Sequence, residues 1–426
     1  MTKQLRTRNL KLLILTQYFP PEVGAPQNRL FELAVRLKRI GVDVSVLTAI
    51  PNYPQMKIYD GYEGKDYLYE EIEGIPVHRA SIYLPKSKSI IQRLLNYFSF
   101  VYSSAKVGKN KIGDVDVIMC ESPPLFLGYS ALYLKRKKKA KLIFNVSDLW
   151  PESAEKLGVV TNKWVLKLAY NLEAKLYRKS VLVTGQTQGI CKSINERFPE
   201  VKTYWLPNGV DVSYYNPSSV TSNWRKDNGF QVNDILFLYA GIIGLAQGLE
   251  IILSAAEKVM LRQAQHSEFK HIKFILLGSG PEKEKLQAIK QEKQLTNVYF
   301  FDAVSKTQMP QIVQASDVSV IPLRKLELFL GAIPSKIFEN LAMEKAVILA
   351  VDGEARELFV NQGKCALYSE PENVEDLVKN VLLLANDASL RKQLGERGRM
   401  YVEQSFNRNT IAQNFYNELI KYAGKN

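Results

Sequence analysis

One short stretch of the sequence places a cation, a carboxylate and a hydroxyl at helical spacing. It spans residues 330–340, LGAIPSKIFEN, and joins an apolar strand-like run to a helix-like run. Proline does not continue a helix, so Pro334 predicts a helix that begins with Ser335 as its N-cap. Lys336 then lies in the first turn, where free backbone N–H groups and the helix dipole favour an anion such as phosphate. Glu339 follows one turn later on the same face, where it would accept hydrogen bonds from a neutral diol such as a ribose.

A structural alternative for this stretch is an ordinary surface pair of Lys336 and Glu339 at i,i+3 spacing. A capping box is a second alternative, and it requires Glu or Gln three residues after the N-cap. That position holds Phe338. Glu339 lies one residue past the position that a capping box requires, which favours a role in binding a ligand.

The elements that position these residues follow from length and periodicity. A chain of 426 residues exceeds one core and suits two domains. Aliphatic runs of strand length alternate with amphipathic helical stretches, which predicts an α/β fold with parallel sheets covered by helices. We expect a first domain over residues 1–205, a second over 206–405, and a final helix, about 406–426, that packs back onto the first. The expected strands are 10–16, 43–48, 115–120, 141–146, 181–185, 201–206, 235–240, 273–277, 298–301 and 318–323.

Glycine-rich or polar loops follow four expected strands of the second half. The loop after 235–240 contains Gly241, Gly244, Gln247 and Gly248, and the loop after 273–277 is Gly278-Ser279-Gly280-Pro281. The spacing matches neither the dinucleotide fingerprint nor a P-loop. Because ligands bind at the carboxyl ends of parallel strands, these two loops, 302–306 and 330–340 are expected to share one rim.

The first half offers weaker candidates at its own strand ends. Gly24 and Ala25 precede a helix expected over 28–40, and their small side chains would let a phosphate or sugar approach the backbone. The alternative is a loop that merely turns a corner. Asp148 and Glu152 follow strand 141–146 and are candidates for the acceptor side, although both residues would also serve to cap the next helix.

Charge is distributed unevenly along the chain. The net charge is +14, with 32 Lys and Arg against 18 Asp and Glu in residues 1–205, and 25 against 25 in residues 206–426. The densest basic run is 135–141, and the aromatic stretch 88–107 is either a core helix or an interfacial membrane helix. The basic half predicts attraction to an anionic surface, either phospholipid or nucleic acid.

Metal, disulfide and membrane-spanning signals are weak. Cys120, Cys191 and Cys365 are scattered among apolar neighbours, so neither a disulfide framework nor a zinc cluster is expected. No apolar run approaches about 18 residues, and a cytoplasmic protein is expected. No paired-aspartate motif lies near the candidate loops, so we expect metal-independent chemistry with no resident cofactor. None of the three histidines lies in a candidate loop, which argues against a dedicated histidine base.

Six segments occur in a fixed order along the chain: 20–25 (PPEVGA), 148–151 (DLWP), 207–211 (PNGVD), 241–248, 278–281 (GSGP) and 334–339 (PSKIFE). Together they resemble the ordered motifs of retaining GT-B glycosyltransferases of family four, and most closely bacterial O-antigen or exopolysaccharide enzymes of the L-fucosamine-transferase-like kind. This resemblance implies two Rossmann-like domains that face a cleft, with a nucleotide sugar held mainly by the second, and a UDP-linked donor is expected.

The resemblance also assigns roles to residues. Lys336 would bind the diphosphate, Glu339 the ribose, and Asp148 would orient the acceptor, with Gln17, Tyr18 and Glu152 nearby. Two departures stand out: Gly331 occupies the position of the family's second glutamate, and Ile242 and Gln247 replace its Arg and Lys. Further expected donor contacts are Gly24, Ala25, Gly241, Gly244, Gln247, Gly248, Gly278, Ser279, Gly280, Ala303, Val304, Arg324, Ala332, Ile333, Pro334, Ser335 and Ile337.

The expected function is transfer of a sugar from a nucleotide sugar to a lipid-linked or saccharide acceptor at the inner face of the cytoplasmic membrane, with retention of configuration. A nucleotide-sugar 2-epimerase of the same fold is one alternative, but it has no evident use for a basic first domain. A non-enzymatic polyanion-binding protein is another. No nucleic-acid reading motif supports it, so nucleic acid is not expected as a partner.

Overall fold

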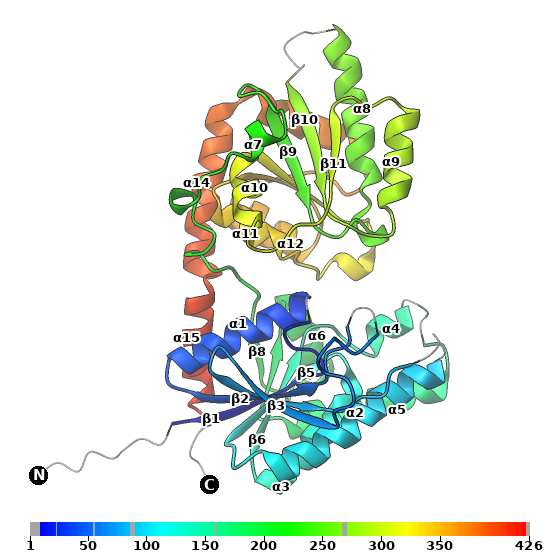
Figure 1. The fold of residues 1–426 in the computed structure, drawn as a ribbon, viewed down its shortest axis with the longest axis vertical. Helices are drawn as coiled ribbons and strands as arrows, with labels where there is room; N and C mark the ends of the chain where they lie inside the picture. Colours follow the sequence, from blue (N-terminus) through cyan, green and yellow to red (C-terminus); the bar gives the residue numbers. More distant parts are fainter. Residues whose placement is uncertain are drawn as a thin grey trace, which may run out of the picture. The chain divides into compact units, whose positions relative to one another are not determined.

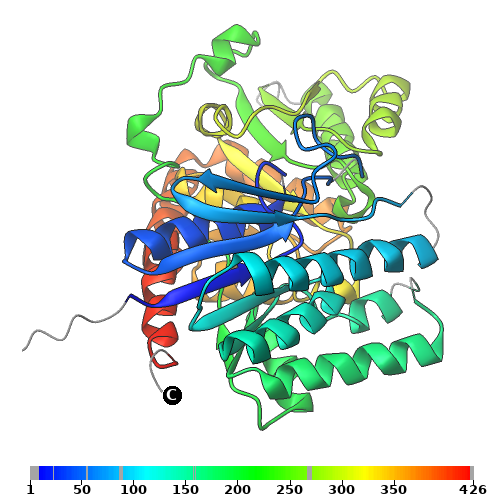
Figure 2. The same ribbon diagram turned by 60° about the horizontal axis from the view of Figure 1, so that its bottom comes forward.

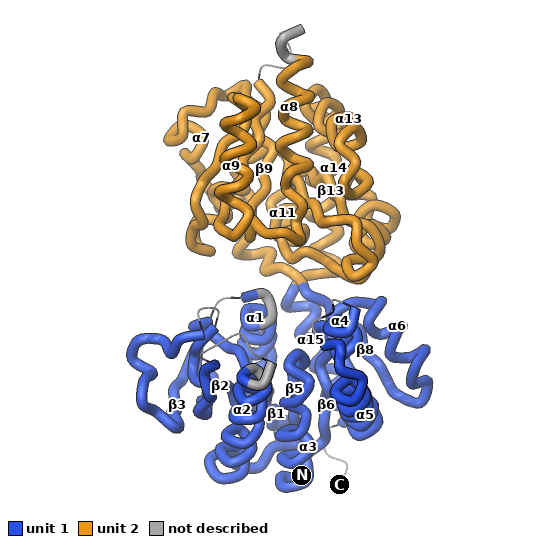
Figure 3. Tube along the Cα trace, turned by 90° about the vertical axis from the view of Figure 1, so that its right-hand side faces the viewer, with its two compact units in different colours: residues 1–208, 408–426 blue, residues 209–407 orange. Residues whose placement is uncertain are grey.

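The chain folds into two compact units. The computed structural model describes residues 9–422 except 23, 54–55, 86–89, 157, 159 and 266–270. Unit 1 consists of residues 1–208 and 408–426, and unit 2 of residues 209–407 (Figure 3). The first boundary lies close to residue 206, where the sequence placed it. The chain passes between the units twice, at 208–209 and at 407–408.

Unit 1 is built on an eight-stranded sheet (Figure 1). The strand order is β3-β4-β2-β1-β5-β6-β7-β8, and every pairing is parallel except β3 with β4. Central strands covered on both faces require nearly continuous apolar runs, which is why the sequence revealed them. The strands are β1 (Lys11–Leu15), β2 (Asp43–Ala49), β3 (Tyr67–Ile72), β4 (Ile75–Ala80), β5 (Val117–Ser122), β6 (Lys141–Val146), β7 (Leu182–Gly185) and β8 (Thr203–Trp205).

Helices cover both faces of this sheet. Alternate residues of a strand point to opposite faces, so Leu12 and Ile14 pack toward α1 and α15, while Leu13 and Leu15 pack toward α2, α3 and α5. The helices of unit 1 are α1 (Ala25–Arg39), α2 (Ile90–Lys111), α3 (Gly128–Lys138), α4 (Glu152–Lys156), α5 (Lys163–Lys179), α6 (Gln188–Arg197) and α15 (Arg408–Leu419).

The C-terminal helix α15 belongs to unit 1, where it packs against α1. Two polar contacts fix this packing. Arg36 Nε donates to Asn409 Oδ1 at 2.9 Å, and Arg408 pairs with Glu32 at 3.5 Å. Figure 2 shows the red α15 beside the blue α1.

Unit 2 has a six-stranded, wholly parallel sheet in the order β11-β10-β9-β12-β13-β14. The strands are β9 (Ile235–Ala240), β10 (Ile272–Leu277), β11 (Val298–Phe301), β12 (Val318–Pro322), β13 (Ala346–Ala350) and β14 (Ala366–Tyr368). The helices are α7 (Trp224–Asp227), α8 (Glu250–Gln265), α9 (Lys283–Glu292), α10 (Met309–Ala315), α11 (Lys336–Ala342), α12 (Glu354–Arg356), α13 (Val374–Asn386) and α14 (Ala388–Ser405). Two helix-covered sheets, parallel except for the pairing of β3 with β4, confirm the predicted α/β class.

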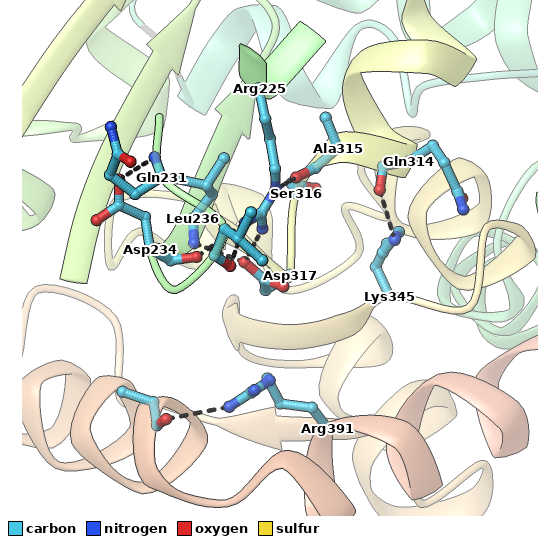
Figure 4. Close-up of polar contacts among 12 residues, drawn as sticks. Arg225, Gln231, Asp234, Leu236, Gln314, Ala315, Ser316, Asp317, Lys345 and Arg391 are labelled. Carbon is cyan, nitrogen blue, oxygen red and sulfur yellow. Dashed lines mark hydrogen bonds and ion pairs between the residues drawn. The ribbon is translucent and has the colours of Figure 1, made fainter. Parts of the chain in front are cut away.

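Polar contacts fasten the amino ends of the unit 2 strands (Figure 4). Arg225 of α7 forms an ion pair with Asp317, which directly precedes β12, and its Nε donates to Ala315 O at 2.6 Å. Asp317 Oδ2 also accepts from the backbone N–H of Leu236 in β9 at 2.7 Å. The opposite, carboxyl ends of these strands carry the candidate site.

Among the helices of the described residues, none combines the length and the apolar character that crossing a membrane requires. The stretch 88–107 falls largely in α2, which buries Phe100 and Val107 against the sheet. The same helix exposes Leu95, Phe98 and Tyr102. The aromatic side chains of α2 therefore lie partly in the core and partly on the surface of unit 1.

Candidate functional site

The carboxyl edge of the unit 2 sheet gathers four loops from neighbouring parallel strands. Because β11, β10, β9 and β12 are adjacent, the loops that follow them lie along one edge, as the sequence predicted. Backbone hydrogen bonds connect the loops. Gly278 N donates to Phe301 O at 3.0 Å, Ile243 N to Ser279 O at 2.9 Å, and Arg324 N to Ala246 O at 2.9 Å. The loops therefore form one continuous, hydrogen-bonded rim.

Two glycines of this rim allow neighbouring loops to pack closely against each other. Gly278 and Gly280 have φ values of 149° and 154°. A Cβ on Gly278 would lie 1.9 Å from Gly241 O, and a Cβ on Gly280 would lie 2.2 Å from Ile243 O. The missing side chains therefore make room for the neighbouring backbone, and the donor contacts of Gly278 and Gly280 stay predictions.

Lys336 reaches from the start of α11 to the start of the glycine loop after β9. Its Nζ lies 3.8 Å from the centroid of the Tyr239 ring. Gly241 has φ 145°, and a Cβ there would come 2.6 Å from Lys336 Nζ. Tyr239 is buried, and its hydroxyl donates to Ile242 O. A cation from one loop thus stands beside an open glycine backbone from the next.

The ammonium of Lys336 is crowded by protein. Desolvation lowers the pKa of Lys336 to about 7, and nearby Glu339 opposes that change. The residue as a whole keeps part of its surface exposed. The face of an aromatic ring attracts a cation, and an anion that approached Nζ would restore the charged form. In the free protein at neutral pH, Lys336 is therefore close to its pKa and only partly protonated.

Arg324 supplies a second cation on the rim. Gly248 has φ 57°, and a Cβ there would lie 3.1 Å from Arg324 Cγ, so the arginine stem rests on this glycine. Arg324 Nε is buried and has no hydrogen-bond partner within the described part of the chain. The structure therefore places Lys336 beside Gly241 and Arg324 beside Gly248 on the loop that follows β9.

Glu339 lies one turn into α11, near a tyrosine that sequence reasoning missed. Burial, and then Glu339, raises the pKa of Tyr214. The Tyr214 hydroxyl donates to Lys306 O at 3.0 Å, in the loop after β11. Tyr214 is thus hydrogen-bonded to the 302–306 loop and lies within electrostatic reach of the Glu339 carboxylate. The available signal was an aromatic pair, Tyr214 and Tyr215, directly after the 207–211 motif.

Of two predictions about the start of α11, the N-cap position of Ser335 is confirmed without a side-chain cap, and the donor contact of Ile337 is wrong. Ser335 occupies the N-cap position, but its φ and ψ of −57° and −29° are already helical, and its side chain makes no cap hydrogen bond. Ile337 is fully buried among core residues, and its N–H donates to Pro334 O at 3.1 Å. Neither the side chain nor the N–H of Ile337 is therefore available to a donor.

The remaining rim candidates differ in exposure. Gly244 is buried in extended backbone, and a Cβ there would lie 3.0 Å from Gln247 Oε1, so Gln247 folds over its own loop. Ser279 and Ala303 are exposed, whereas Gln247, Val304, Ala332, Ile333 and Pro334 are partly exposed.

In unit 1, Asp148 and Glu152 have different surroundings. Asp148 is exposed after β6, and its Oδ1 accepts from the Ser153 hydroxyl at 2.5 Å. Glu152 pairs with Lys156 at 2.8 Å and lies 3.9 Å from Arg197. Glu152 is therefore occupied in surface ion pairs, and Asp148 is the better acceptor-side carboxylate.

Gln17 and Tyr18 turn inward after β1. Gln17 is 1% exposed, and its Nε2 donates to Asn96 Oδ1 at 3.3 Å and to the Tyr18 hydroxyl at 3.2 Å. Burial is the main cause of a raised pKa at Tyr18. The predicted acceptor contact of Gln17 is corrected, because its side chain fastens the β1 loop to α2.

Gly24 and Ala25 open α1, which begins earlier than the predicted Asn28. Asn28 N donates to Gly24 O at 3.0 Å, and Gly24 is extended, with φ 179°. A Cβ on Gly24 would meet only the flexible end of the Gln27 side chain, 2.3 Å from its Oε1. The first turn of α1 thus follows β1 in a strand–loop–helix arrangement that suits an anion.

Metal-binding chemistry was not expected from the sequence. Within the residues that the structure describes, no group of three or more His, Cys, Asp or Glu side chains is arranged to hold a metal ion. Cys120, Cys191 and Cys365 are free thiols. The charged side chains at the unit 2 rim include Lys336, Arg324 and Glu339 and the ion pair of Lys283 with Asp302.

Comparison with known proteins identifies both halves of the chain. Residues 27–214 match the model of "Glycosyltransferase Family 4", and residues 220–401 match that of "Glycosyl transferases group 1". The chain is 25% identical over 422 residues to the putative colanic acid biosynthesis glycosyl transferase WcaI of Escherichia coli K12, covering 96% of this chain and 100% of that protein.

Two more similarities extend along nearly the whole chain. The O-antigen chain mannosyltransferase C of Escherichia coli is 22% identical, covering 93% of this chain and 94% of that protein. The crystal structure of Anabaena Alr3699/HepE in complex with UDP and glucose superimposes with a TM-score of 0.70 at 18% identity, covering 97% of this chain and 100% of that one. The two matched domains together account for most of the chain, which is therefore a glycosyltransferase of the GT-B fold, with a family 4 domain followed by a group 1 domain.

Proposed function

We propose that this glycosyltransferase moves a sugar from a UDP-sugar to a lipid-linked or saccharide acceptor during assembly of a surface polysaccharide, with retention of configuration. The names of two relatives, one assigned to colanic acid and one to O-antigen, support the pathway class. A similar fold that holds UDP and glucose supports the choice of donor. Nucleotide-binding and transfer assays distinguish this function from the two alternatives, an epimerase and a polyanion-binding protein.

The observation that carries the donor assignment is the placement of the Lys336 ammonium beside Gly241. A nucleoside diphosphate requires positive charge and backbone that it can approach closely. Lys336 offers the positive charge, and Gly241 offers the accessible backbone. A Cβ built on Gly241 would lie 2.6 Å from Lys336 Nζ. Arg324, which rests on Gly248, adds charge on the same rim. Glu339 is then placed to accept hydrogen bonds from the ribose hydroxyls.

In the proposed reaction the bond between the anomeric carbon and the β-phosphate oxygen breaks, and its electron pair leaves with UDP. The acceptor hydroxyl oxygen forms the new bond on the same face, and its proton passes to the leaving phosphate oxygen. Lys336, Arg324 and backbone N–H groups stabilise the charge that develops on the diphosphate, so transfer proceeds without a metal ion. Asp148 accepts a hydrogen bond from the acceptor hydroxyl and orients it.

A second element of the proposal is a membrane-docking surface on unit 1. The helices α2, α3 and α5 lie side by side on one face of the sheet (Figure 2). Tyr102 is 72% exposed, Trp164 75% and Leu168 68%. This three-helix surface consists of the exposed apolar residues Leu95, Phe98, Tyr102, Tyr129, Tyr133, Trp164 and Leu168 and the exposed basic residues Lys106, Lys109, Arg136, Lys137, Lys167 and Lys175.

Exposed aromatic side chains combined with lysines suit the interface of an anionic bilayer, where rings enter the headgroup region and cations meet lipid phosphates. A lipid-linked acceptor is present at such a surface. The proposed location is therefore the cytoplasmic face of the membrane, with unit 1 in contact with lipid. Nucleic acid would satisfy the charges but has no evident use for an exposed aliphatic side chain such as Leu168.

The donor assignment is tested by titrating the protein with a panel of nucleoside diphosphates and by assaying transfer from UDP-sugars to a membrane extract. We expect UDP to bind, and labelled sugar to move into the lipid fraction at an equal rate with and without EDTA. Glu339→Gln should weaken UDP binding about tenfold or more, because a ribose hydroxyl loses a charged acceptor.

Other outcomes identify the alternatives. Conversion of the donor to its 2-epimer without transfer would identify an epimerase, and the absence of nucleotide binding would favour a polyanion-binding protein. Loss of transfer in EDTA with rescue by Mg²⁺ or Mn²⁺ would contradict the metal-free mechanism.

A further inference from the structure

Three buried polar side chains form a row at the carboxyl ends of β5, β6 and β7. In the sheet register Glu121 faces Asn145, and Asn145 faces Thr184. Their exposed fractions are 3%, 1% and 0%. Two positions earlier, on the same face, these strands carry the core residues Met119, Ile143 and Leu182. The polar row therefore replaces apolar side chains at the strand ends only.

The hydrogen bonds of the polar row converge on Glu121. Thr184 Oγ1 donates to Asn145 Oδ1 at 2.5 Å, and Asn145 Nδ2 donates to Glu121 Oε2. The other carboxylate oxygen, Oε1, accepts from Arg29 Nη2 of α1 at 2.9 Å and from the Ser147 hydroxyl. Arg29 Nη2 also donates to Ser147 Oγ. Both members of the Arg29–Glu121 ion pair therefore hold Ser147.

Stability alone does not account for this ion pair. Its side chains are 9% and 3% exposed, so both charges are desolvated. Well-packed apolar residues in place of a buried ion pair are often neutral or stabilising. Arg29 Nη1 is also buried and has no hydrogen-bond partner among the described residues, which adds to the cost of burial.

What the pair does achieve is to fix Ser147, the residue immediately before Asp148. The Ser147 side chain is held by Arg29 and Glu121, and its N–H donates to Ser122 O at 2.8 Å. The Asp148 carboxylate is held on its other side by the Ser153 hydroxyl at 2.5 Å. The buried hydrogen bonds of Arg29, Glu121 and Ser147 thus fix the backbone next to Asp148 and orient its exposed carboxylate.

We propose that Arg29 and Glu121 are positioning residues that act through Ser147 to hold Asp148 in the orientation in which it directs the acceptor hydroxyl. This inference rests on the proposed function, because it requires Asp148 to take part in transfer. Thr184 and Asn145 support the carboxylate of Glu121 from the opposite side. The Arg29–Glu121 pair is therefore coupled to catalysis without contact with either substrate.

The first test deletes the link itself. Ser147→Ala leaves the ion pair intact, and we expect it to lower kcat for transfer about 10- to 100-fold while the Kd for UDP, bound in unit 2, stays unchanged. Ser147→Thr restores a hydroxyl and should recover most of the activity. Ser104→Ala is a matched control, since it deletes another buried serine hydroxyl in unit 1, bonded to Ser130 at 2.9 Å, and should leave kcat unchanged.

The second test is a double-mutant cycle. In the Asp148→Asn background, Ser147→Ala should lower kcat less than twofold further, because the residue through which it acts is already disabled. Replacing the pair together, with Arg29→Met and Glu121→Leu, should lower kcat as Ser147→Ala does, with an unchanged or higher Tm. If Ser147→Ala has the same effect in both backgrounds, or retains full activity, the inference is wrong.

These outcomes separate the inference from the proposed function. If the wild-type protein binds no nucleotide and transfers no sugar, the proposed function fails. If the wild-type protein transfers sugar and Asp148→Asn or Ser147→Ala does so equally well, the positioning role fails while the donor site of Lys336 and Glu339 stands.

Discussion

Lys336 Nζ stands 3.8 Å above the ring of Tyr239, so the cation of the candidate donor site rests on a buried aromatic face. The ring attracts the ammonium but excludes water from it, and desolvation lowers the pKa of Lys336 to about 7. A diphosphate at Gly241 would supply the negative charge that Lys336 needs to stay protonated. Binding of the donor and protonation of this lysine are therefore expected to be coupled.

Lys336→Met should weaken UDP binding by about 1–3 kcal/mol, roughly tenfold to a hundredfold, because a charged hydrogen bond to the diphosphate is lost. The Tm should not fall, since a desolvated ammonium is replaced by an apolar side chain of similar length. Calorimetric titration with UDP and a thermal melt measure the two effects.

Lys345→Met is the matched control for this variant. Burial also lowers the pKa of Lys345, whose Nζ donates to Gln314 O at 3.0 Å at the amino end of the same sheet (Figure 4). The control should bind UDP normally. Equal affinity of wild type and Lys336→Met would place the diphosphate elsewhere.

UDP binding should take up protons above neutral pH. The pKa of Lys336 is lowered in the folded protein, so this lysine is largely neutral at pH 8 and must be protonated when the diphosphate binds. The affinity should therefore fall as pH rises from 7 to 9, by up to about tenfold per pH unit. Titrations in buffers of different ionisation enthalpy count the protons. Lys336→Met should remove the uptake, whereas an unchanged proton count in that variant would assign it to another group.

The same lowered pKa affects folding in a defined direction. Between pH 7 and 10.5 the unfolded chain holds a proton on Lys336 that the free folded protein releases, so this group makes stability rise with pH in that window. Below pH 7 both states are protonated and the contribution is constant. Lys336→Met should flatten this part of the stability profile.

Much of the fold was predictable because parallel strands buried on both faces are continuous apolar runs, although β13, which is such a run, and β14 were not predicted. The strands 235–240 and 141–146 match β9 and β6 along their whole length. The β3–β4 hairpin was not predicted, since Tyr67–Ile72 is a short mixed run, YLYEEI, that contains two adjacent carboxylates and lies at the sheet edge. Edge strands carry the weakest hydrophobic signal.

The site was predictable where residue chemistry alone decides it, as for Lys336 and Glu339. It was not predictable where packing decides. Gly278 reads as a ligand-facing glycine, but it is required by the carbonyl of Gly241, 37 residues away in sequence. Ile337 and Gln17 read as site residues, but they are buried, and burial depends on long-range contacts that a local motif does not record.

The ion pair at the amino end of unit 2 should matter for stability and not for transfer. Asp317→Asn weakens the contact with Arg225 and the acceptor for Leu236 N, and we expect a loss of about 1–3 kcal/mol in the free energy of unfolding. Denaturant titration measures the loss. Because Asp317 lies at the opposite strand ends from Lys336, the kcat of the folded variant should equal that of wild type. A lowered kcat at full folding would indicate coupling between the two ends of the sheet.

Membrane docking should depend on the exposed basic residues of the 135–141 run and not on the whole run. Lys135 Nζ donates to Lys179 O at 2.5 Å, and Lys138 Nζ donates to Lys109 O at 3.1 Å, so both side chains are used within unit 1. Arg136, Lys137 and Lys139 are exposed. Each is worth about 1 kcal/mol at an anionic surface, so reversing all three to Glu should weaken binding to anionic vesicles a hundredfold or more. Sedimentation with phosphatidylglycerol-containing vesicles measures this loss.

A control with the same change of charge separates a specific surface from net charge. Reversal of Lys226, Lys379 and Lys392 to Glu alters exposed residues of unit 2 and should leave vesicle binding nearly unchanged. Trp164→Ser with Leu168→Ser keeps every charge and should weaken binding, because these side chains are 75% and 68% exposed and enter the lipid interface. If both charge reversals weaken binding equally and the apolar variant has no effect, the attraction is a diffuse property of a basic chain, and competition by RNA would then identify nucleic acid as the better partner.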